Sequence, residues 1–580
     1  MAKPACRTTT GTMKKKNNKP TKTKSKMKKT MRFLSMAALA LVGAVMTGCT
    51  NDDNIIDEPQ QPASKSNVVT LTTTVGFDDA AGTRAVTTEG VKTFAVGETM
   101  AIYYWKNKGN DHEKAVSAPL TAGDIINGGK SATFTFTLDN PYKDQSVVYI
   151  YPAAMANADF TPNYDALYNN QDGTLATLAS NFDFCTKSGA WAGENLPSLT
   201  LENQLAILAI TLKDEAGAND ITSSITGLTL SDGTYSYSVT RSAAAGPIYV
   251  AIRPTSSANI DITATDGTKN YTKTLTSKTY AASNGYPVSW KMTQVATDLS
   301  TLTAAYTAQN GDILTGTLGS NVKISIADGA SVTLKDVNIN GSGTWTSGDY
   351  AGITCLGDAT ITLEGTNTVK GFDEDYPGIH VPEGKTLTIN GTGSASITAS
   401  SNGYGAGIGG GNGVACGNIV INGGTVTATG GEYAAGIGGG DNYLPCGNIV
   451  INGGTVTATG GYMGAGIGSS NYGSCGAITI SGGTVTATGG YRGAGIGSGE
   501  TGACGAITIS GGTVTATGID GAAGIGGGYQ NGDCGTITIK STVTKVTATK
   551  GSYAPYSIGA GNDGAGITVK IEAGANVTQN

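Results

Sequence analysis

A motif of 29 or 30 residues recurs through the carboxyl-terminal part of this 580-residue chain. Successive copies read CGNIVINGGTVTATGG or a close variant, and isoleucine keeps the same spacing. Each copy carries one cysteine, at Cys416, Cys446, Cys475, Cys504 and Cys534. Self-similarity at a fixed period of this length is typical of a solenoid, in which each copy forms one coil stacked on the preceding coil.

Each copy contains three strand-like pieces, NIVI, TVTAT and AAGIG, separated by glycine-rich corners. Three short strands and three bends make one rung of a parallel β-helix, and the handedness of parallel crossovers favours a right-handed coil. Looser alternation upstream extends the solenoid from about residue 312 to about 572, with 301–320 as a candidate cap. The side chains expected to point inward are Ile419, Ile421, Val426, Ala428, Ala435 and Ile437.

The five repeat cysteines are expected to form one column inside the solenoid. A disulfide ladder is conceivable in an exported protein. Thiols that project in parallel from stacked rungs have poor geometry for pairing, however, and five is an odd number. The sequence therefore favours reduced, buried, structural cysteines.

The amino terminus has the features of an export signal. The first 48 residues hold twelve Lys or Arg and no acidic residue, and the apolar segment FLSMAALALVGAVMTG leads directly to Cys49. Residues 46–49, MTGC, resemble a bacterial lipobox, which implies a signal peptide over 1–48 and a lipid on Cys49. An ordinary signal peptide with an incidental cysteine is the alternative, and translation from Met27 is an open possibility. Residues 49–66, acidic and then rich in Pro and Ser, form a flexible tether.

The charge balance limits the partners. Without the twelve basic residues of the signal segment, 25 basic residues face 43 acidic ones, a net charge of −18. Such a chain is unsuited to nucleic acid or to an anionic bilayer surface. We therefore expect neither as a partner.

Residues 67–294 read as many short strands with turn residues between them. The segment VVTLTTTVGF, residues 68–77, alternates with period two, as expected for a strand with one buried face. AIYYW, ATFTFTL, SVVYIYP and LAILAITL follow in the same manner, and no helical periodicity persists. The fold class predicted for the whole chain is all-β, with one or two antiparallel β-sandwiches over 67–294 and a β-helix domain with caps over 295–580.

Four segments of this first half carry a family resemblance. TRAVTTEGVKTFAVGETMAIYYW, NQLAILAITL, GPIYVAIRP and YAASNGYPVSWKM resemble the fimbrillin family of Bacteroidota pilus proteins. The resemblance implies a surface lipoprotein that is cut after an arginine, so that loss of its first strand opens a groove for a strand of the next subunit. Arg84 lies where such a cut would fall, just after the strand over 68–77. A solvated loop arginine is the alternative.

Two periodic sets of side chains on the repeats are candidates for ligand binding. Outward-facing threonines recur at Thr427, Thr457, Thr486 and Thr515, and tyrosines recur 29 residues apart at Tyr404, Tyr433, Tyr462 and Tyr491. Tyrosine rings can stack on sugars while their hydroxyls form hydrogen bonds. The alternatives are that threonine simply suits exposed strands, that the threonines order water, and that the tyrosines only cover a corner.

The loop GFDEDYPGIH offers a third candidate site. Asp373, Glu374 and Asp375 could hold Ca²⁺ through oxygen ligands, although the spacing is not that of an EF-hand and a solvated turn is the alternative. No other cofactor is expected. The looser solenoid resembles the calcium-associated carbohydrate-binding β-helices of bacterial cell surfaces.

Catalysis is not expected, because the perfect repeats have few charged groups to supply an acid and a base. The chain has two histidines in all. The function predicted from the sequence is that of a fimbrial tip or accessory adhesin at the outer membrane, whose β-helix binds a glycan. A surface polysaccharide-degrading enzyme and a purely structural stalk are the alternatives. The charged residues between 401 and 540 are Glu432, Asp441, Arg492, Glu500, Asp520, Asp533 and Lys540.

Overall fold

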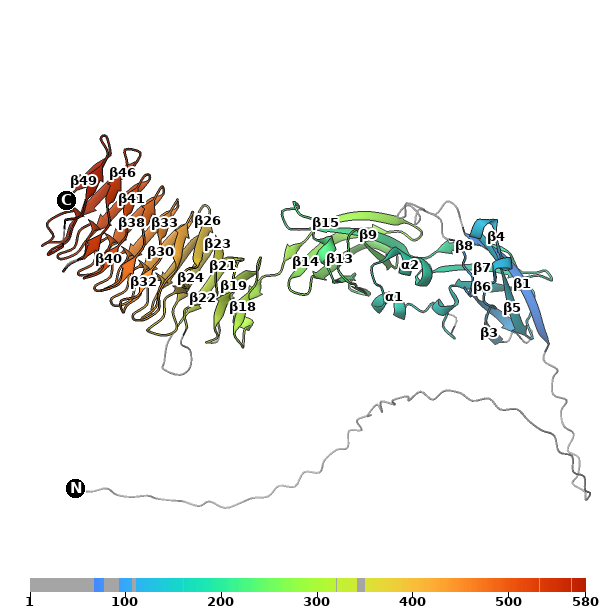
Figure 1. Cartoon of the computed structure of the whole chain (residues 1–580). Helices are drawn as coiled ribbons and strands as arrows, with labels where there is room; N and C mark the ends of the chain where they lie inside the picture. The colour runs from blue at the N-terminus through green and yellow to red at the C-terminus, as the bar shows by residue number, and fades with distance from the viewer. Residues whose placement is uncertain are drawn as a thin grey trace, which may run out of the picture. The chain divides into compact units, whose positions relative to one another are not determined.

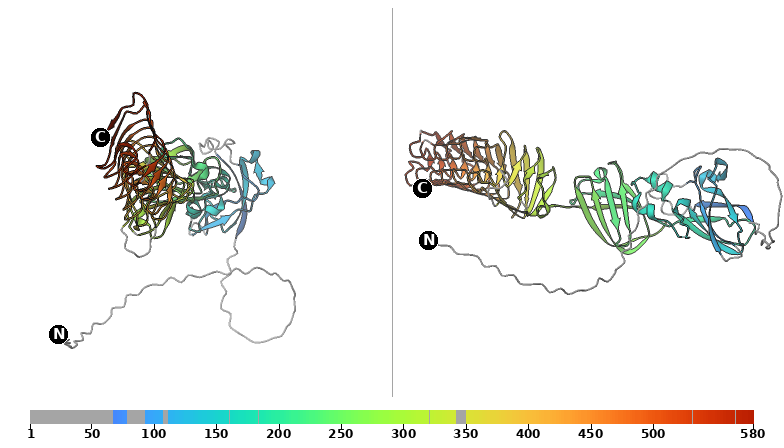
Figure 2. Two further views of the ribbon diagram at one scale, coloured as in Figure 1. Left: turned by 60° about the vertical axis from the view of Figure 1, so that its left-hand side comes forward. Right: turned by 90° about the horizontal axis from the view of Figure 1, so that it is seen from below.

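The structure is a computed structural model, drawn in Figures 1 and 2. It describes residues 67–77, 93–106, 111–159, 161–182, 184–319, 321–341, 350–530, 532–564 and 566–580. The predicted signal peptide and tether, Cys49 and Arg84 lie outside these residues. Within them, no helix combines the length and the apolar composition needed to cross a membrane.

The first part of the described chain, which we name the first sandwich, is an eight-stranded sheet in the order β3-β2-β6-β7-β8-β1-β5-β4. Side chains from most of its strands meet in one core, which includes Phe134, Phe136, Tyr149 and Trp191. The strands are β1 (Val68–Phe77), β2 (Ala101–Lys106), β3 (Asp111–Val116), β4 (Ile125–Ile126), β5 (Ser131–Asp139), β6 (Gln145–Tyr151), β7 (Cys185–Trp191) and β8 (Leu199–Asn203).

Strand β1 has neighbours on both sides. It pairs antiparallel with β5 from Val68↔Asp139 to Gly76↔Ser131, and parallel with the end of β8 from Val75↔Leu199 to Phe77↔Leu201. Val75 is buried in the core, and the Phe77 ring lies 4.3 Å from the Phe94 ring. The alternation of the sequence predicts this strand, while its parallel pairing with β8 departs from an all-antiparallel sandwich.

A second sandwich-like unit follows, and its core also includes Ala101, Tyr103 and Ile150 from strands β2 and β6 of the first sheet. A five-stranded sheet (β11-β10-β13-β14-β16) and a three-stranded sheet (β12-β9-β15) share this core. Two short helices, α1 (Asp165–Asn169) and α2 (Leu175–Asn181), contribute side chains to it, which the sequence analysis did not anticipate. The strands are β9 (Ala206–Lys213), β10 (Gly227–Ser231), β11 (Ser236–Thr240), β12 (Ile248–Ile252), β13 (Thr255–Thr265), β14 (Asn270–Tyr280), β15 (Gly285–Lys291) and β16 (Thr293–Gln294).

The repeats form a parallel β-solenoid whose rungs are stacked in Figure 1. Its longest sheet has nineteen strands. These are β17 (Thr297–Asp298), β19 (Ile313–Thr317), β21 (Ala330–Asn340), β23 (Ala359–Glu364), β24 (Thr366–Lys370), β26 (Thr386–Gly391), β27 (Ser396–Ser400), β29 (Asn418–Ile421), β30 (Thr425–Thr429), β33 (Ile449–Ile451), β34 (Thr455–Thr459), β37 (Ile478–Ile480), β38 (Thr484–Thr488), β41 (Ile507–Ile509), β42 (Thr513–Thr517), β45 (Ile537–Ile539), β46 (Lys545–Thr549), β48 (Val569–Ile571) and β49 (Val577–Gln579).

A ten-stranded sheet closes the other side of each rung, and a four-stranded sheet runs along the cysteines. The ten strands are β18 (Tyr306–Ala308), β20 (Ile324–Ile326), β22 (Ile353–Cys355), β25 (Ile379–His380), β28 (Ile408–Gly409), β31 (Ile437–Gly438), β35 (Ile467–Gly468), β39 (Ile496–Gly497), β43 (Ile525–Gly526) and β47 (Ile558–Gly559). The four strands are β32 (Pro445–Cys446), β36 (Ser474–Cys475), β40 (Ala503–Cys504) and β44 (Asp533–Cys534).

The register of these sheets confirms the predicted stacking of identical residues. Ile408 pairs with Ile437, and Ile437 pairs with Ile467. All six side chains predicted to point inward are fully buried. Solenoid strands begin at Thr297 and continue to Gln579, so the coil extends beyond the predicted 312–572, and the expected cap over 301–320 contributes strands of its own. The right-handed coil stays a prediction.

The cysteine column is buried as predicted, but its predicted reduced state is wrong for four of the five members. The structure has two disulfides, Cys416–Cys446 and Cys504–Cys534, and leaves Cys475 between them as a buried thiol. The two cysteines of each pair have Cα atoms only 4.3 and 4.5 Å apart, because adjacent rungs are in register. Neighbouring thiols are therefore close enough to form a disulfide, and because the column has five cysteines, one of them stays unpaired.

Candidate functional site

The four predicted tyrosines form a row along the solenoid. Ring centroids are 6.2 Å apart for Tyr404 and Tyr433, 6.4 Å for Tyr433 and Tyr462, and 5.2 Å for Tyr462 and Tyr491. The ring planes of the first and last pairs are nearly parallel, with interplanar angles of 2° and 8°, whereas those of Tyr433 and Tyr462 are 79° apart. Tyr462 and Tyr491 are exposed. We name these four residues the long tyrosine row.

Glycine corners place this row. The chain turns just after each TVTAT strand, where the corner of one rung lies directly on the corner of the next. A Cβ on Gly461 would lie 1.6 Å from the Gly431 carbonyl oxygen, so no larger residue fits there. The tyrosine follows one or two residues later and is the first aromatic side chain of each corner. The stacked corners thus set the spacing of the rings at about that of the rungs.

A second set of tyrosines, Tyr443 and Tyr472, was missed by the sequence analysis. Both are exposed, at 65% and 46%, and their rings lie 5.0 Å apart. They are 29 residues apart, like the members of the long row, but the set has only two members and therefore a weak periodic signal. We name this pair the short tyrosine row.

One polar row adjoins both tyrosine rows. Its members are Asp441, Asn471 and Glu500, and we name it the central row. The backbone N–H of Asp441 donates to the Tyr404 carbonyl at 3.3 Å, and that of Asn471 donates to the Tyr433 carbonyl at 2.9 Å. Tyr472 directly follows Asn471 in the chain. The three rows therefore lie on one stretch of surface.

Carboxylates surround Tyr433. Burial, together with the negative charges of Glu432 and Asp375, raises the pKa of the Asp441 carboxyl above its ordinary value of 3.8. A hydrogen bond with Glu432, and the charge of that carboxylate, raise the pKa of Tyr433. These four groups come from two rungs, Asp375 from one and the other three from the rung two turns further on, and they are close enough to act on one another. Three of the four are acidic. The surface beside the long row has negative potential.

The last ring of the long row lies beside an ion-pair cluster. Arg492 Nη1 lies 2.7 Å from Glu500 Oε1, and Arg492 Nε lies 3.8 Å from Asp520 Oδ2. The guanidinium is 5.5 Å from the centre of the Tyr491 ring and 4.7 Å from that of Tyr529. Because one cation is shared by the buried carboxylate of Glu500 and the half-buried carboxylate of Asp520, the cluster carries net negative charge and holds the corner in place.

The four threonines predicted to face outward alternate with buried residues. Thr427, Thr457, Thr486 and Thr515 are exposed or half-buried, and the Val and Ala residues on either side are buried. Their register is continuous, with Thr427 opposite Thr457 and Thr457 opposite Thr486. A flat row of hydroxyl and methyl groups therefore exists, and its role in binding a ligand stays a prediction.

The calcium prediction gains no support from the geometry. Asp373 Oδ1 accepts a hydrogen bond from the Asp375 N–H at 3.0 Å, and Asp375 Oδ1 accepts one from the Asn412 side chain at 2.5 Å. Glu374 is exposed. Across the part of the chain that the structure describes, no three His, Cys, Asp or Glu side chains are arranged to hold a metal ion. The acidic loop instead uses its carboxylates to fix its own turn and that of the next rung.

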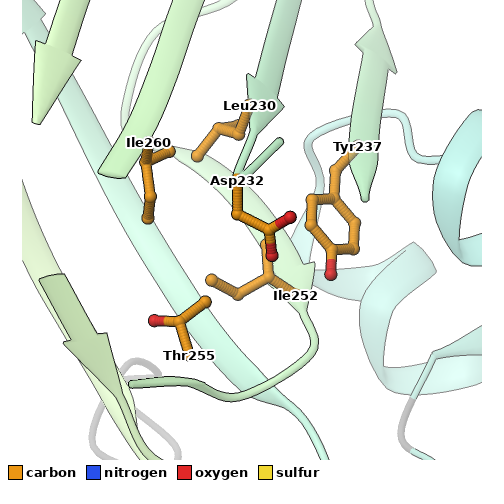
Figure 3. A pocket seen from close by; sticks show the side chains of 6 residues that line it. All are labelled: Leu230, Asp232, Tyr237, Ile252, Thr255 and Ile260. Atoms are coloured by element: carbon orange, nitrogen blue, oxygen red, sulfur yellow. The ribbon is translucent and has the colours of Figure 1, made fainter. Parts of the chain in front are cut away.

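The second sandwich contains a small cavity, shown in Figure 3. Its volume of about 10 Å³ is room for about one water molecule and far too little for a sugar unit. Three of the six lining side chains are aliphatic, and none is paired as an acid with a base. This cavity is a packing gap rather than a substrate site. The lining residues are Leu230, Asp232, Tyr237, Ile252, Thr255 and Ile260.

Comparisons with known proteins identify the repeats. Residues 419–441, 449–471, 478–500 and 507–529 match a family model described as a beta helix repeat. These matches coincide with four rungs of the parallel solenoid. No curated protein sequence matches the chain.

Three solved structures of bacterial proteins show a distant likeness. A candidate cell adhesion protein from Bacteroides uniformis is 15% identical over 39% of this chain and 97% of its own, with a TM-score of 0.23. Another candidate cell adhesion protein, from Bacteroides fragilis, is 12% identical over 37% of this chain and 91% of its own, with a TM-score of 0.24. A fimbrial assembly protein from Parabacteroides distasonis is 12% identical over 39% of this chain and 92% of its own, with a TM-score of 0.23. At these values the function has to be argued from the site itself.

Proposed function

We propose that this protein is a cell-surface adhesin whose solenoid binds a glycan on the long tyrosine row. The observation that carries the proposal is the row itself, with its half-exposed rings repeated rung after rung. Exposed aromatic rings lower the solubility of a protein. A continuous patch of them on the surface is therefore typical of a binding site.

The repeat distance favours a polymer with a regular unit. Rungs of a parallel sheet are about 4.8 Å apart, which is close to the length of one sugar in an extended chain. A glycan lying along the solenoid would thus meet an equivalent tyrosine at each unit. Ring faces contact the apolar faces of sugars, and the phenol hydroxyls and the central row supply hydrogen bonds.

Retention of the full chain on a glycan array tests this proposal. Tyr433→Ala together with Tyr462→Ala removes the two middle rings and should weaken binding about tenfold or more, since each ring contributes on the order of 1 kcal/mol. Tyr556→Ala is the matched control, because its ring is 58% exposed and lies two residues before Ile558, a position that holds alanine and no row tyrosine in the earlier rungs. Retention on no glycan would overturn the proposal in favour of a structural stalk, and cleavage of a bound glycan would indicate an enzyme.

Strand β1 supports a second part of the proposal, assembly with other subunits by strand exchange. It lies between β5 and β8, so its removal would leave two strand edges and part of the core open. A cut after Arg84 separates β1 from the rest of the chain. Cleaved protein should then bind an added strand peptide, while an Arg84→Ala variant resists cleavage and binds none. Failure of the cleaved protein to take up any strand would contradict this part.

The membrane anchor completes the proposed function. Cys49 would carry the lipid, and the solenoid would be presented outside the outer membrane. Incorporation of labelled fatty acid into the parent but not into Cys49→Ser checks the anchor. Labelling of both proteins would exclude Cys49 as the lipidation site.

A further inference from the structure

The short tyrosine row calls for its own explanation. Tyr443 and Tyr472 have left-handed backbones, with φ of 65° and 54°. A residue with a Cβ is disfavoured there, and glycine or asparagine fits best. Thr501 and Gln530 take up the same conformation in the next rungs, so the turn itself needs no ring. The chain thus displays an exposed ring at a costly position, and only in two adjacent rungs.

The orientation of the rings in the long row changes in the same two rungs. Tyr433 also has a positive φ, 97°, and its ring is turned by 79° from that of Tyr462, while the pairs on either side are parallel. The break in the long row and the whole of the short row therefore coincide along the solenoid. The tyrosines are concentrated at one place rather than spread evenly.

Unpartnered polar atoms lie next to these rings. Asn471 Oδ1 and Ser470 Oγ are buried, and neither has a hydrogen-bond partner. Asn471 is held against Tyr433 by its backbone hydrogen bond and precedes Tyr472. A buried polar atom without a partner is costly, and in a native site it commonly marks a contact with a ligand or an ordered water.

The charge of this surface restricts what it binds. Glu432 and Asp441 lie beside Tyr433 in the middle of the patch, and Glu500 continues the central row. Between 401 and 500 the chain has one cation, Arg492, and its ion pairs with Glu500 and Asp520 already neutralise it. A polyanion would be repelled, whereas a chain without acid groups would meet hydroxyls, amides and carboxylates as hydrogen-bond partners.

We propose that Tyr433, Tyr462, Tyr443 and Tyr472 form one binding site for an extended, non-acidic sugar chain that runs along the solenoid axis. The long and short rows contact the sugar rings, and the central row, with Asp441 and Asn471, hydrogen-bonds their hydroxyls. This inference rests on the proposed function and narrows it to a site of two rungs and to neutral or amine-bearing glycans.

The test uses the full chain and matched sets of immobilised oligosaccharides. The neutral set holds hexasaccharides of β-glucan, xylan and chitin, and the acidic set holds oligogalacturonate and hyaluronan of equal length. Tyr443→Asn with Tyr472→Asn removes the short row but keeps residues that tolerate a left-handed backbone. This variant should bind the neutral set about tenfold more weakly than the parent. Circular dichroism checks that its fold is unchanged, and Tyr556→Ala serves as the control.

The outcomes separate this inference from the proposed function. If Tyr433→Ala with Tyr462→Ala weakens binding and the short-row variant does not, the two-row site is wrong and the adhesin proposal stands. Preference of the parent for the acidic set over the neutral set also overturns the inference alone. Retention of the parent on neither set overturns both.

Discussion

The cores of the first sandwich and of the solenoid are built on different principles. In the sandwich, Phe134, Phe136 and Trp191 each occupy a unique place among strands far apart in the sequence. In the solenoid, Ile437 lies between Ile408 and Ile467, which have the same surroundings. A unique core position depends on many contacts of different kinds, whereas a column position depends on the rungs above and below it.

This difference explains where a binding surface can arise. Because the strands of successive rungs are stacked in register, an outward side chain repeated in the sequence becomes a row in space, as the tyrosines and threonines do. The sandwich offers no such rows, but it has a strand, β1, whose long-range pairing makes it exchangeable. Ligand binding therefore fits the solenoid, and subunit assembly fits the sandwich.

The largest effect we predict is at a solenoid corner. Gly461→Ala places a Cβ against the Gly431 carbonyl oxygen, a backbone atom that cannot move without separating two rungs. The free energy of unfolding of the solenoid should fall by roughly 4 kcal/mol or more. Gly566→Ala is the matched control, because its Cβ meets no atom within 4 Å. Equal thermal stability of the two variants would show that the rungs are not packed this closely.

The next effect compares the two cores directly. Phe136→Ala should cost the first sandwich roughly 3–5 kcal/mol, and Ile437→Ala should cost the solenoid roughly 2–5 kcal/mol, since both side chains are fully buried. The two residues belong to separate core clusters, so each variant should destabilise its own region. Hydrogen exchange followed by mass spectrometry resolves the regions. Loss of protection in both regions from either change would mean that they unfold together.

The sequence predicts the solenoid well because its information is local and repeated. Period, strand pieces and inward residues all follow from one alignment of the copies. The position of β1 does not follow, because the pairing of Val75 with Leu199 joins residues 124 positions apart and leaves no local signal. The disulfides do not follow either, because the pattern gives the column of cysteines but not how the neighbouring thiols are directed.

The candidate site was predicted in part. A row of four tyrosines is visible in the sequence, whereas Tyr443 and Tyr472 appear in loops whose length varies between copies. The proximity of Asp441, Glu432 and Asp375 depends on how the corners of three rungs stack. Asp375 is about two periods away from Glu432 and Asp441, and sequence spacing alone does not tell which atoms meet across the rungs.

The smallest effect we predict concerns the acidic surface of the site. Burial and two neighbouring carboxylates raise the pKa of Asp441 in the folded protein above its ordinary value of 3.8. The ionised form is therefore disfavoured in the fold, and this penalty is absent at low pH and complete once the pH exceeds the folded pKa. Asp441→Asn removes the charge but keeps an oxygen to accept the Asn442 N–H.

The variant should thus be slightly more stable than the parent at pH 7, and the difference should disappear as the pH falls below about 3.8, where the parent carboxyl is neutral in both states. Urea titrations at the two pH values measure this. Asp533→Asn is the control, because that exposed carboxylate lies on the cysteine side of the rung and likewise accepts the N–H of the next residue. A gain in stability at low pH, or a loss at pH 7, would mean that Asp441 stabilises its corner as a carboxylate.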